Sequence, residues 1–306
     1  MKVLLATQKP FSPAAVQGIK DIIENAGHDF CLLEKYESQT DLEKAVADVN
    51  ALIVRSDKVT AEVVAAAPNL KIVVRAGAGY DNIDLQACTA AGVVAMNTPG
   101  QNSNAVAELA IALMIFMART QFTPATGSEI KGKTIGIQAF GNVGRLVGAK
   151  AASLGMKVKA IDPFLSAEEI AAGGAQPAKD LEDLYSSSNY VSIHIPATPD
   201  TVHTIGYNLV SKMPKGATLV NTARKEVIDE EGLLKILEER EDLKYVTDVA
   251  PDMIEEFKSR LGTRFFATPR KMGAQTSEAN VNSGFAAARQ INDFFATGNR
   301  RFQLNK

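Results

Sequence analysis

Residues 134–147 of the chain read TIGIQAFGNVGRLV, and this stretch decides the fold class. A short apolar run leads into closely spaced glycines and then into a helix-like segment, which predicts a strand, a tight turn and a helix. The spacing is that of a dinucleotide-binding turn, G-x-G-x-x-G, except that Ala139 takes the place of the first glycine. Gly141 would let the backbone approach a pyrophosphate, and Gly144 would let the helix pack closely on its strand. Ala139 must then make the tight turn.

The residues around this turn favour NAD as the ligand. Asn142 and Val143 open the predicted helix, whose N–H groups and positive potential suit an anion. The next predicted strand, residues 157–161, ends at Asp162. A carboxylate there accepts hydrogen bonds from an adenosine ribose and repels a 2′-phosphate, so NAD is favoured over NADP. Each feature alone is also typical of a simple turn, but the order strand, glycine turn, helix, strand and acid favours nucleotide binding.

Short apolar runs alternate with segments rich in Ala, Glu and Lys along the whole chain. The runs occur at residues 2–6, 51–54, 71–74, 134–137, 157–161, 190–193, 217–220 and 244–247. This alternation predicts βαβ units around parallel sheets, and a length of 306 residues favours two domains. The predicted fold class is therefore α/β, with two Rossmann-like, doubly wound parallel-sheet domains. The apolar segment 102–119 indicates a buried helix at a domain junction.

The composition excludes several other classes of protein. Lys and Arg number 33 against 35 Asp and Glu, so no global field attracts nucleic acid or an anionic membrane. The two cysteines, Cys31 and Cys88, have no CxxC motif and no histidine cluster, which argues against a disulfide framework or a metal site. The N-terminus lacks a signal-peptide pattern, and the longest apolar run, residues 109–118, is too short to span a bilayer. We therefore expect a cytoplasmic protein.

Seven stretches carry a family resemblance. They are residues 75–84 (RAGAGYDNID), 102–108 (NSNAVAE), the glycine turn, 194–199 (HIPATP), 221–224 (NTAR), 247–249 (TDV) and 273–276 (GAQT). With them the sequence resembles the D-isomer-specific 2-hydroxyacid dehydrogenase family, most closely its short D-3-phosphoglycerate dehydrogenases. The resemblance implies a homodimer, with a cleft between a discontinuous substrate-binding domain, residues 1–97 plus 284–306, and an NAD-binding Rossmann domain, residues 98–283. The C-terminus is expected to leave no room for a regulatory domain.

The resemblance also assigns catalytic roles. Arg224 matches the arginine that holds the substrate carboxylate and carbonyl, a task for which its planar fork is suited. The family's acid/base histidine stands just before the Gly-Ala pair, where this chain has Lys271. Lysine can serve because its pKa falls readily on desolvation or beside another cation, here Arg224. Arg270 is a poor alternative because a guanidinium is effectively never deprotonated.

The family also has a carboxylate that supports the acid/base group. The family places a glutamate five residues after the position of Asp248, where this chain has Met253. We choose Asp252, while Glu255, Glu256 and a plain solvated acidic loop stay open as alternatives. The remaining cofactor contacts that the resemblance implies are His194, Ile195, Pro196, Thr222, Ala223, Asp248 and Gly273. Of these, Asp248 is expected near the nicotinamide carboxamide.

The first domain is expected to choose the substrate. By resemblance the contacts are Arg55, Ser56, Arg75, Asn102 and the backbone N–H groups of Gly77, Ala78 and Gly79. Two arginines suit a phosphate dianion, so the expected reaction is NAD-dependent oxidation of D-3-phosphoglycerate to 3-phosphohydroxypyruvate, the first step of serine biosynthesis. The alternatives are a glyoxylate or hydroxypyruvate reductase and a non-catalytic NAD-binding regulatory protein.

Overall fold

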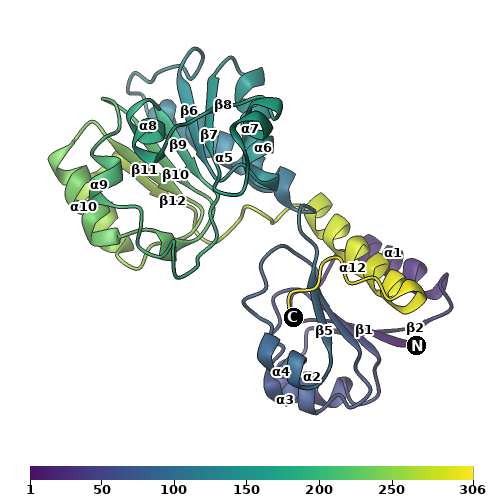
Figure 1. The fold of residues 1–306 in the computed structure, drawn as a ribbon. Helices are drawn as coiled ribbons and strands as arrows, with labels where there is room; N and C mark the ends of the chain where they lie inside the picture. Colours follow the sequence, from purple (N-terminus) through teal and green to yellow (C-terminus); the bar gives the residue numbers. More distant parts are fainter. Residues whose placement is uncertain (306) are drawn as a thin grey trace. The chain divides into compact units, whose positions relative to one another are not determined.

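The computed structural model describes residues 1–305, which form two compact units (Figure 1). Unit 1 comprises Met1–Asn102 and the segment from Gln275 onward, and unit 2 comprises Ser103–Ala274. The sequence placed the two crossings after residues 97 and 283 instead. The second difference has a clear cause, because helix α12 (Ser277–Thr297) is continuous and packs along α1 (Pro13–Glu24) of unit 1. Its N-cap, Thr276, accepts a hydrogen bond from the N–H of Ala279 at 3.1 Å.

Unit 1 contains a five-stranded parallel sheet in the order β2-β1-β3-β4-β5. The strands are β1 (Lys2–Thr7), β2 (Asp29–Glu34), β3 (Ala51–Val54), β4 (Ile72–Arg75) and β5 (Val94–Asn97). Figure 1 shows α1 and α12 on one face, and α2 (Gln39–Ala45), α3 (Ala61–Ala65) and α4 (Leu85–Ala90) on the other. Because both faces are covered, the central strands are continuous apolar runs rather than alternating ones.

Unit 2 contains a seven-stranded parallel sheet in the order β12-β11-β10-β9-β6-β7-β8. The strands are β6 (Thr134–Gln138), β7 (Lys157–Ile161), β8 (Gln176–Pro177), β9 (Tyr190–Ile193), β10 (Thr218–Asn221), β11 (Lys244–Thr247) and β12 (Phe265–Ala267). One core lies under α5 (Ser103–Ala118), α6 (Asn142–Ser153) and α7 (Ala167–Ala172). The other lies under α8 (Leu181–Ser186), α9 (Tyr207–Val210), α10 (Glu230–Glu239) and α11 (Ile254–Leu261). Three short 3₁₀ turns are η1 (Thr120–Phe122), η2 (Lys225–Val227) and η3 (Gly262–Arg264).

Both sheets are doubly wound, which confirms the predicted fold class. In unit 1 the winding reverses between β1 and β3, and in unit 2 it reverses between β6 and β9. Ligands of such sheets bind outside the carboxyl ends of the strands at this reversal. The predicted site residues lie at or after the ends of β3, β4 and β5 in unit 1, and after β6, β7, β9, β10, β11 and β12 in unit 2.

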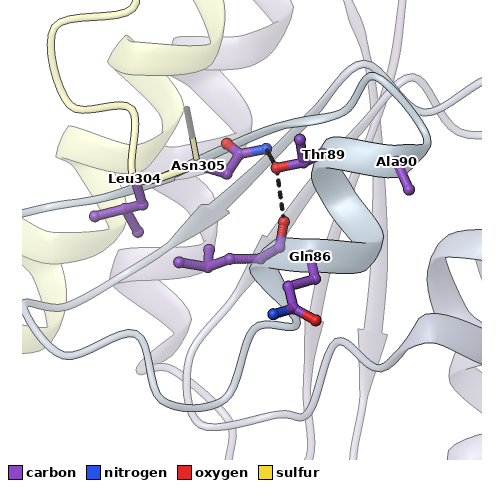
Figure 2. Close-up of a pocket in the computed structure, with 6 residues that line it drawn as sticks. Gln86, Thr89, Ala90, Leu304 and Asn305 are labelled. Atoms are coloured by element: carbon purple, nitrogen blue, oxygen red, sulfur yellow. Dashed lines mark hydrogen bonds between the residues drawn. The ribbon is translucent and has the colours of Figure 1, made fainter.

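The C-terminal segment of unit 1 covers the free edge of its sheet. Leu304 N–H donates to Ala95 O at 2.8 Å, and the side chain of Asn305 accepts from Ala95 N–H at 2.8 Å. Figure 2 shows Asn305 Nδ2 beside the hydroxyl of Thr89, at 3.2 Å, in a surface pocket that contains none of the predicted site residues. The segment thus satisfies edge groups of β5 that would otherwise be exposed.

Within residues 1–305, no helix combines the length and the apolarity that crossing a bilayer requires. Over the same range, no group of three or more His, Cys, Asp or Glu side chains gathers in an arrangement that could hold a metal ion.

Candidate active site

The turn after β6 is made by Ala139 in place of a glycine. Its φ of 75° lies in the left-handed region, which is uncommon for residues other than glycine. A hydrogen bond from Ala139 N–H to Ile161 O, at 2.9 Å, fixes this conformation against the end of β7. Gly141 then forms the N-cap of α6, which starts at Asn142 and Val143. The chain thus reaches the helix N-terminus by the route that a dinucleotide-binding turn takes.

The two glycines of the turn differ in what they permit. A Cβ on Gly144 would lie 2.2 Å from Ala139 O, so glycine is required for the helix to pack on its strand. A Cβ on Gly141 would have no heavy atom within 4 Å, and its φ of −78° suits any residue. The fold therefore does not require glycine at position 141. The space left open at the helix N-terminus is what a pyrophosphate needs.

This difference gives a paired prediction for Gly141→Ala and Gly144→Ala. The change at Gly144 forces atoms apart and should lower the free energy of unfolding by about 1–3 kcal/mol, as overpacking does. The change at Gly141 should leave the free energy of unfolding within about 0.5 kcal/mol of the original. It should nevertheless weaken NADH binding by at least about tenfold, because a methyl group fills the space beside the helix N-terminus. Thermal unfolding and a fluorescence titration with NADH measure the two effects, and an unchanged Kd in Gly141→Ala contradicts the assignment.

Asp162 connects the glycine turn to the end of β7. Its Oδ2 accepts the N–H of Phe140 at 2.8 Å, and its Oδ1 accepts the N–H of Phe164 at 2.9 Å. Each carboxylate oxygen has a second acceptor position. The carboxylate is thus oriented by the backbone and can still accept the two hydroxyls of a ribose, as predicted for an NAD site.

His194, at the end of β9, has the environment of a structural residue. Its backbone N–H donates to Gln138 O at 2.9 Å, and its ring Nε2 lies 2.9 Å from Ser192 Oγ. Burial lowers the pKa of the imidazole to about 4, because desolvation disfavours the charged form. The ring is therefore neutral near pH 7. The chain then continues through buried Ile195 to exposed Pro196.

The segment after β10 is held rigid by Asn221. Its Oδ1 accepts the N–H of Ala223 at 2.9 Å, and its Nδ2 donates to Arg224 O at 2.9 Å. Thr222 lies between Asn221 and Ala223. Its buried hydroxyl has no hydrogen-bond partner in the part of the chain that the structure describes. Buried polar atoms are rarely left unpaired. The orphaned hydroxyl, the open space at Gly141 and the oriented Asp162 therefore fit a bound dinucleotide.

The structure brings the two predicted catalytic cations together. Arg224 Nη1 donates to Ala223 O at 3.0 Å, and Lys271 Nζ donates to the same oxygen at 3.4 Å. The side chains come from segments that follow β10 and β12, strands separated in the sheet by β11 alone. The guanidinium of Arg224 and the amine of Lys271 thus lie at the same end of the sheet. A carboxylate anchor and an acid/base group that act on one substrate have to lie this close together.

Asp248, directly after β11, has a role that the sequence did not reveal. Its carboxylate is fully buried, and Oδ1 accepts the N–H of Met272 at 2.8 Å. Oδ2 accepts the N–H of Gly273 at 2.7 Å. Both of these residues follow Lys271 directly. The sequence placed Asp248 beside the nicotinamide, and only the aligned strand ends show that it also binds this segment.

Asp252, the predicted support of Lys271, lies at the surface. Its carboxylate forms an ion pair with Lys225 and its side chain is 77% exposed. Its backbone N–H is bound by Glu230 at 2.9 Å. Of the other candidates, Glu255 pairs with Lys258 at 3.0 Å, and Glu256 is exposed. The supporting role of Asp252 for Lys271 therefore stays a prediction, without a contact in its favour.

Arg55 lies at the winding reversal of unit 1, directly after β3. Its guanidinium lies over the ring of Phe11, 5.3 Å from the centroid, and desolvation lowers its pKa. Among the described residues the guanidinium makes no hydrogen bond or ion pair. Buried Asp57 holds this turn through the N–H of Arg55 at 3.2 Å and the hydroxyl of Tyr36 at 2.8 Å. A half-buried cation of this kind is suited to an anionic ligand.

Arg75 and the glycine loop adjoin Arg55. Arg75 Nε donates to Arg55 O at 2.8 Å. A Cβ on Gly77 would lie 1.9 Å from Arg75 Nη1, so the absent side chain lets the guanidinium lie across the loop. Asn97, which the sequence analysis did not single out, donates to Ala78 O at 2.6 Å and holds the loop. Gly79 and Asn102 are half-buried and Ser56 is exposed.

A doubly wound sheet with a glycine turn at its reversal and an acid after the next strand defines unit 2 as a nucleotide-binding dehydrogenase domain. Residues 110–269 match the family described as D-isomer specific 2-hydroxyacid dehydrogenase, NAD binding domain. The chain belongs to the D-isomer-specific 2-hydroxyacid dehydrogenase family, whose NAD cofactor the sequence also predicted.

Named relatives lie in the same family. The chain is 34% identical over 299 residues to a D-3-phosphoglycerate dehydrogenase of Synechocystis, covering 90% of this chain and 53% of that protein. It is 37% identical over 283 residues to a hydroxypyruvate reductase of Thermotoga maritima, covering 85% of this chain and 88% of the relative. It thus spans about half the length of the curated phosphoglycerate dehydrogenases that it matches.

A solved structure resembles the whole chain. The NAD⁺-bound 3-phosphoglycerate dehydrogenase of Entamoeba histolytica has a TM-score of 0.91 and 49% identity, covering 100% of this chain and 99% of that one. The match confirms the two-unit fold and supports the fit of a dinucleotide to unit 2. The homodimer stays a prediction.

Proposed function

We propose that this protein oxidises D-3-phosphoglycerate to 3-phosphohydroxypyruvate with NAD. The observation that carries the substrate assignment is the pair Arg55 and Arg75, which lie at the carboxyl ends of the neighbouring strands β3 and β4, beside a glycine loop. Arg75 Nε donates to the backbone oxygen of Arg55 at 2.8 Å. Two guanidinium groups and the backbone N–H groups of Ala78 and Gly79 supply donors of the kind that a phosphate and a carboxylate require. The N–H of Gly77 already donates to Arg75 O at 2.9 Å. The names of the relatives from Synechocystis and Entamoeba histolytica support the same substrate.

Arg224 orients the carbon that reacts. Its five N–H donors form a planar fork, which binds the substrate carboxylate and the oxygen on C2 in one fixed orientation. One of these donors is directed at Ala223 O at 3.0 Å, so the guanidinium has an anchor on the backbone. The positive charge also stabilises the carbonyl oxygen as it forms.

Lys271 moves the proton. In the oxidation direction its neutral amine accepts the proton of the C2 hydroxyl at Nζ, the C–O bond becomes a carbonyl, and the C2 hydrogen leaves with its electron pair. Gly141, Asp162 and Thr222 would hold NAD, which when bound would supply the acceptor for that hydride. In the reverse direction the ammonium form returns the proton. The oxidation rate should therefore rise toward alkaline pH.

Arg55→Ala tests the assignment of the phosphate. We expect kcat/KM for 3-phosphohydroxypyruvate to fall by about 100-fold, because a charged partner of the phosphate is lost. For hydroxypyruvate, which has no phosphate, kcat/KM should change by no more than about threefold. A change of that size corresponds to no more than the net free energy of one ordinary hydrogen bond. Lys71→Ala, which removes an exposed cation just before β4, is the matched control and should change neither value. Equal losses for both substrates in Arg55→Ala would exclude the phosphate role.

A second candidate function is hydroxypyruvate or glyoxylate reduction. The Thermotoga maritima relative, of which the chain covers 88%, favours it. That reaction uses the same Arg224 and Lys271 chemistry but leaves Arg55 without a phosphate to bind. A third candidate, an NAD-binding protein without turnover, predicts NADH binding and no consumption with any of these acids.

A further inference from the structure

The strongest unassigned feature is the set of hydrogen bonds around Asp248. Its carboxylate is fully buried in unit 2 and is held by uncharged donors from one short segment, residues 268–273, which we call the Lys271 segment. Oδ1 accepts Met272 N–H at 2.8 Å and lies 2.8 Å from Thr268 Oγ1, and Oδ2 accepts Gly273 N–H at 2.7 Å. Burying an ionised carboxylate is costly unless such bonds are made. The carboxylate and the segment therefore hold each other in place.

Residues on both sides of Lys271 contact the carboxylate of Asp248. A Cβ on Gly273 would lie 3.0 Å from Asp248 Oδ2 and 3.3 Å from Val106 Cγ2, so glycine permits the close approach. Before the lysine, Thr268 Oγ1 lies 2.8 Å from Arg270 O as well as from the carboxylate. The hydroxyl proton of Thr268 can be donated either to Asp248 Oδ1 or to Arg270 O. Either hydrogen bond restrains the Lys271 segment.

We propose that Asp248 is the positioning residue for Lys271, an inference that rests on the acid/base role proposed above. The bond to Met272 N–H fixes the peptide group that directly follows Lys271, so it fixes the direction in which the side chain leaves the backbone. A lysine side chain has four rotatable bonds and loses much conformational freedom when it is held in one place. Anchoring its backbone keeps Nζ near Ala223 O, at 3.4 Å, and beside Arg224. Misplacing a reacting group by about 1 Å can cost about 100-fold in rate.

This role leaves Asp248 able to contact the cofactor as well. Oδ1 accepts Met272 N–H and lies beside Thr268 Oγ1, whereas Oδ2 accepts a single bond and keeps one acceptor position. A nicotinamide carboxamide could use that position without breaking a bond to the Lys271 segment. Loss of cofactor binding and loss of lysine positioning are therefore separate effects, which separate measurements distinguish.

A double-mutant cycle with Asp248→Asn and Lys271→Ala tests the proposal. Asparagine keeps the size of the side chain but directs an NH₂ group toward one of the N–H donors, so at least one bond is lost. We expect Asp248→Asn to lower kcat by about 10–100-fold when Lys271 is present. When Lys271 is already alanine, the further loss should be less than about twofold, because groups that act together are non-additive. Multiplying losses would show that Asp248 acts independently of Lys271 and would overturn the proposal.

Two further measurements do not depend on turnover. In Asp248→Asn the amide hydrogens of Met272 and Gly273 should exchange with deuterium faster, and acetic anhydride should label Lys271 with an altered pH dependence. If Lys271→Ala keeps full activity, the acid/base proposal fails. The exchange and labelling data then still decide whether Asp248 orders the segment. Unchanged exchange and unchanged labelling contradict the positioning role.

Control variants separate positioning from general loss of stability. Asp242→Asn removes a carboxylate that binds Arg240 and the N–H of Gly216 in the same unit, at 2.7 and 2.8 Å. We expect that variant to lower the thermal midpoint without changing kcat. Should Asp248→Asn fail to fold, Thr268→Val removes one donor and nearly preserves the shape. It should lower kcat in the same direction, by about threefold to tenfold, in accord with the loss of one hydrogen bond to a charged group.

Discussion

Lys271→Ala should lower kcat for the NADH-dependent reduction of 3-phosphohydroxypyruvate by about 1000-fold, the usual contribution of a positioned acid/base group. The KM for NADH should stay nearly unchanged, because the glycine turn and Asp162 follow other strands, β6 and β7, than the one before Lys271. Arg270→Ala removes the adjacent exposed cation and is the matched control, with activity expected within about threefold of the original. Steady-state kinetics on both variants measures the difference. Retention of more than one tenth of the activity in Lys271→Ala would contradict the assignment.

The pH dependence distinguishes the lysine from other titrating groups. With Lys271 as the base, oxidation rises toward alkaline pH as the amine loses its proton. Lys271→His should retain part of the activity and move the rise toward about pH 6.5, the ordinary range of an imidazole. His194 cannot produce either rise, because burial lowers its pKa to about 4 and it stays neutral throughout. An identical pH profile in the two proteins would exclude Lys271 as the titrating group.

Arg224→Lys should lower kcat/KM by about 100–1000-fold even though the positive charge is kept. The fork of a guanidinium makes two parallel hydrogen bonds to a carboxylate, and an ammonium group cannot reproduce them. Losing one partner of a hydrogen-bonded charge pair that the bound substrate buries costs about 2–5 kcal/mol. A fluorescence titration should give an unchanged Kd for NADH, so that the loss falls on substrate binding and chemistry alone.

The neighbouring Lys225 provides the control for Arg224. Its ion pair with Asp252 is exposed to solvent and contributes little, so Lys225→Ala should leave kcat/KM nearly unchanged. If Arg224→Lys keeps more than one third of the original kcat/KM, the two-bond role of Arg224 is wrong.

Local patterns were enough to predict the fold. The run 134–138, the glycines that follow it and Asp162 are close in sequence, and each has a direct physical meaning in a doubly wound sheet. The structure confirms that order of elements and shows Ala139 making the turn with a φ of 75°. The second crossing between the units was harder to place, because the packing of α12 on α1 joins segments at opposite ends of the chain.

The support of Lys271 could not be predicted in the same way. Asp248 and the Lys271 segment follow neighbouring strands, β11 and β12, and their hydrogen bonds exist only once those strands are aligned. The sequence offered Asp252 because of its spacing, whereas the fold places that side chain at the surface beside Lys225. Asn97 was missed for the same reason, since its bond to Ala78 O depends on the pairing of β5 with β4.

The measurement that tests the central claim most directly is NADH consumption by the purified protein with 3-phosphohydroxypyruvate, run beside hydroxypyruvate and glyoxylate. We predict a kcat/KM at least about 100-fold higher for the phosphorylated acid, since only that substrate uses the charge of Arg55 and Arg75. Equal or faster consumption with an unphosphorylated acid would contradict the proposed substrate. NADH binding without consumption of any of the three would contradict the proposed activity.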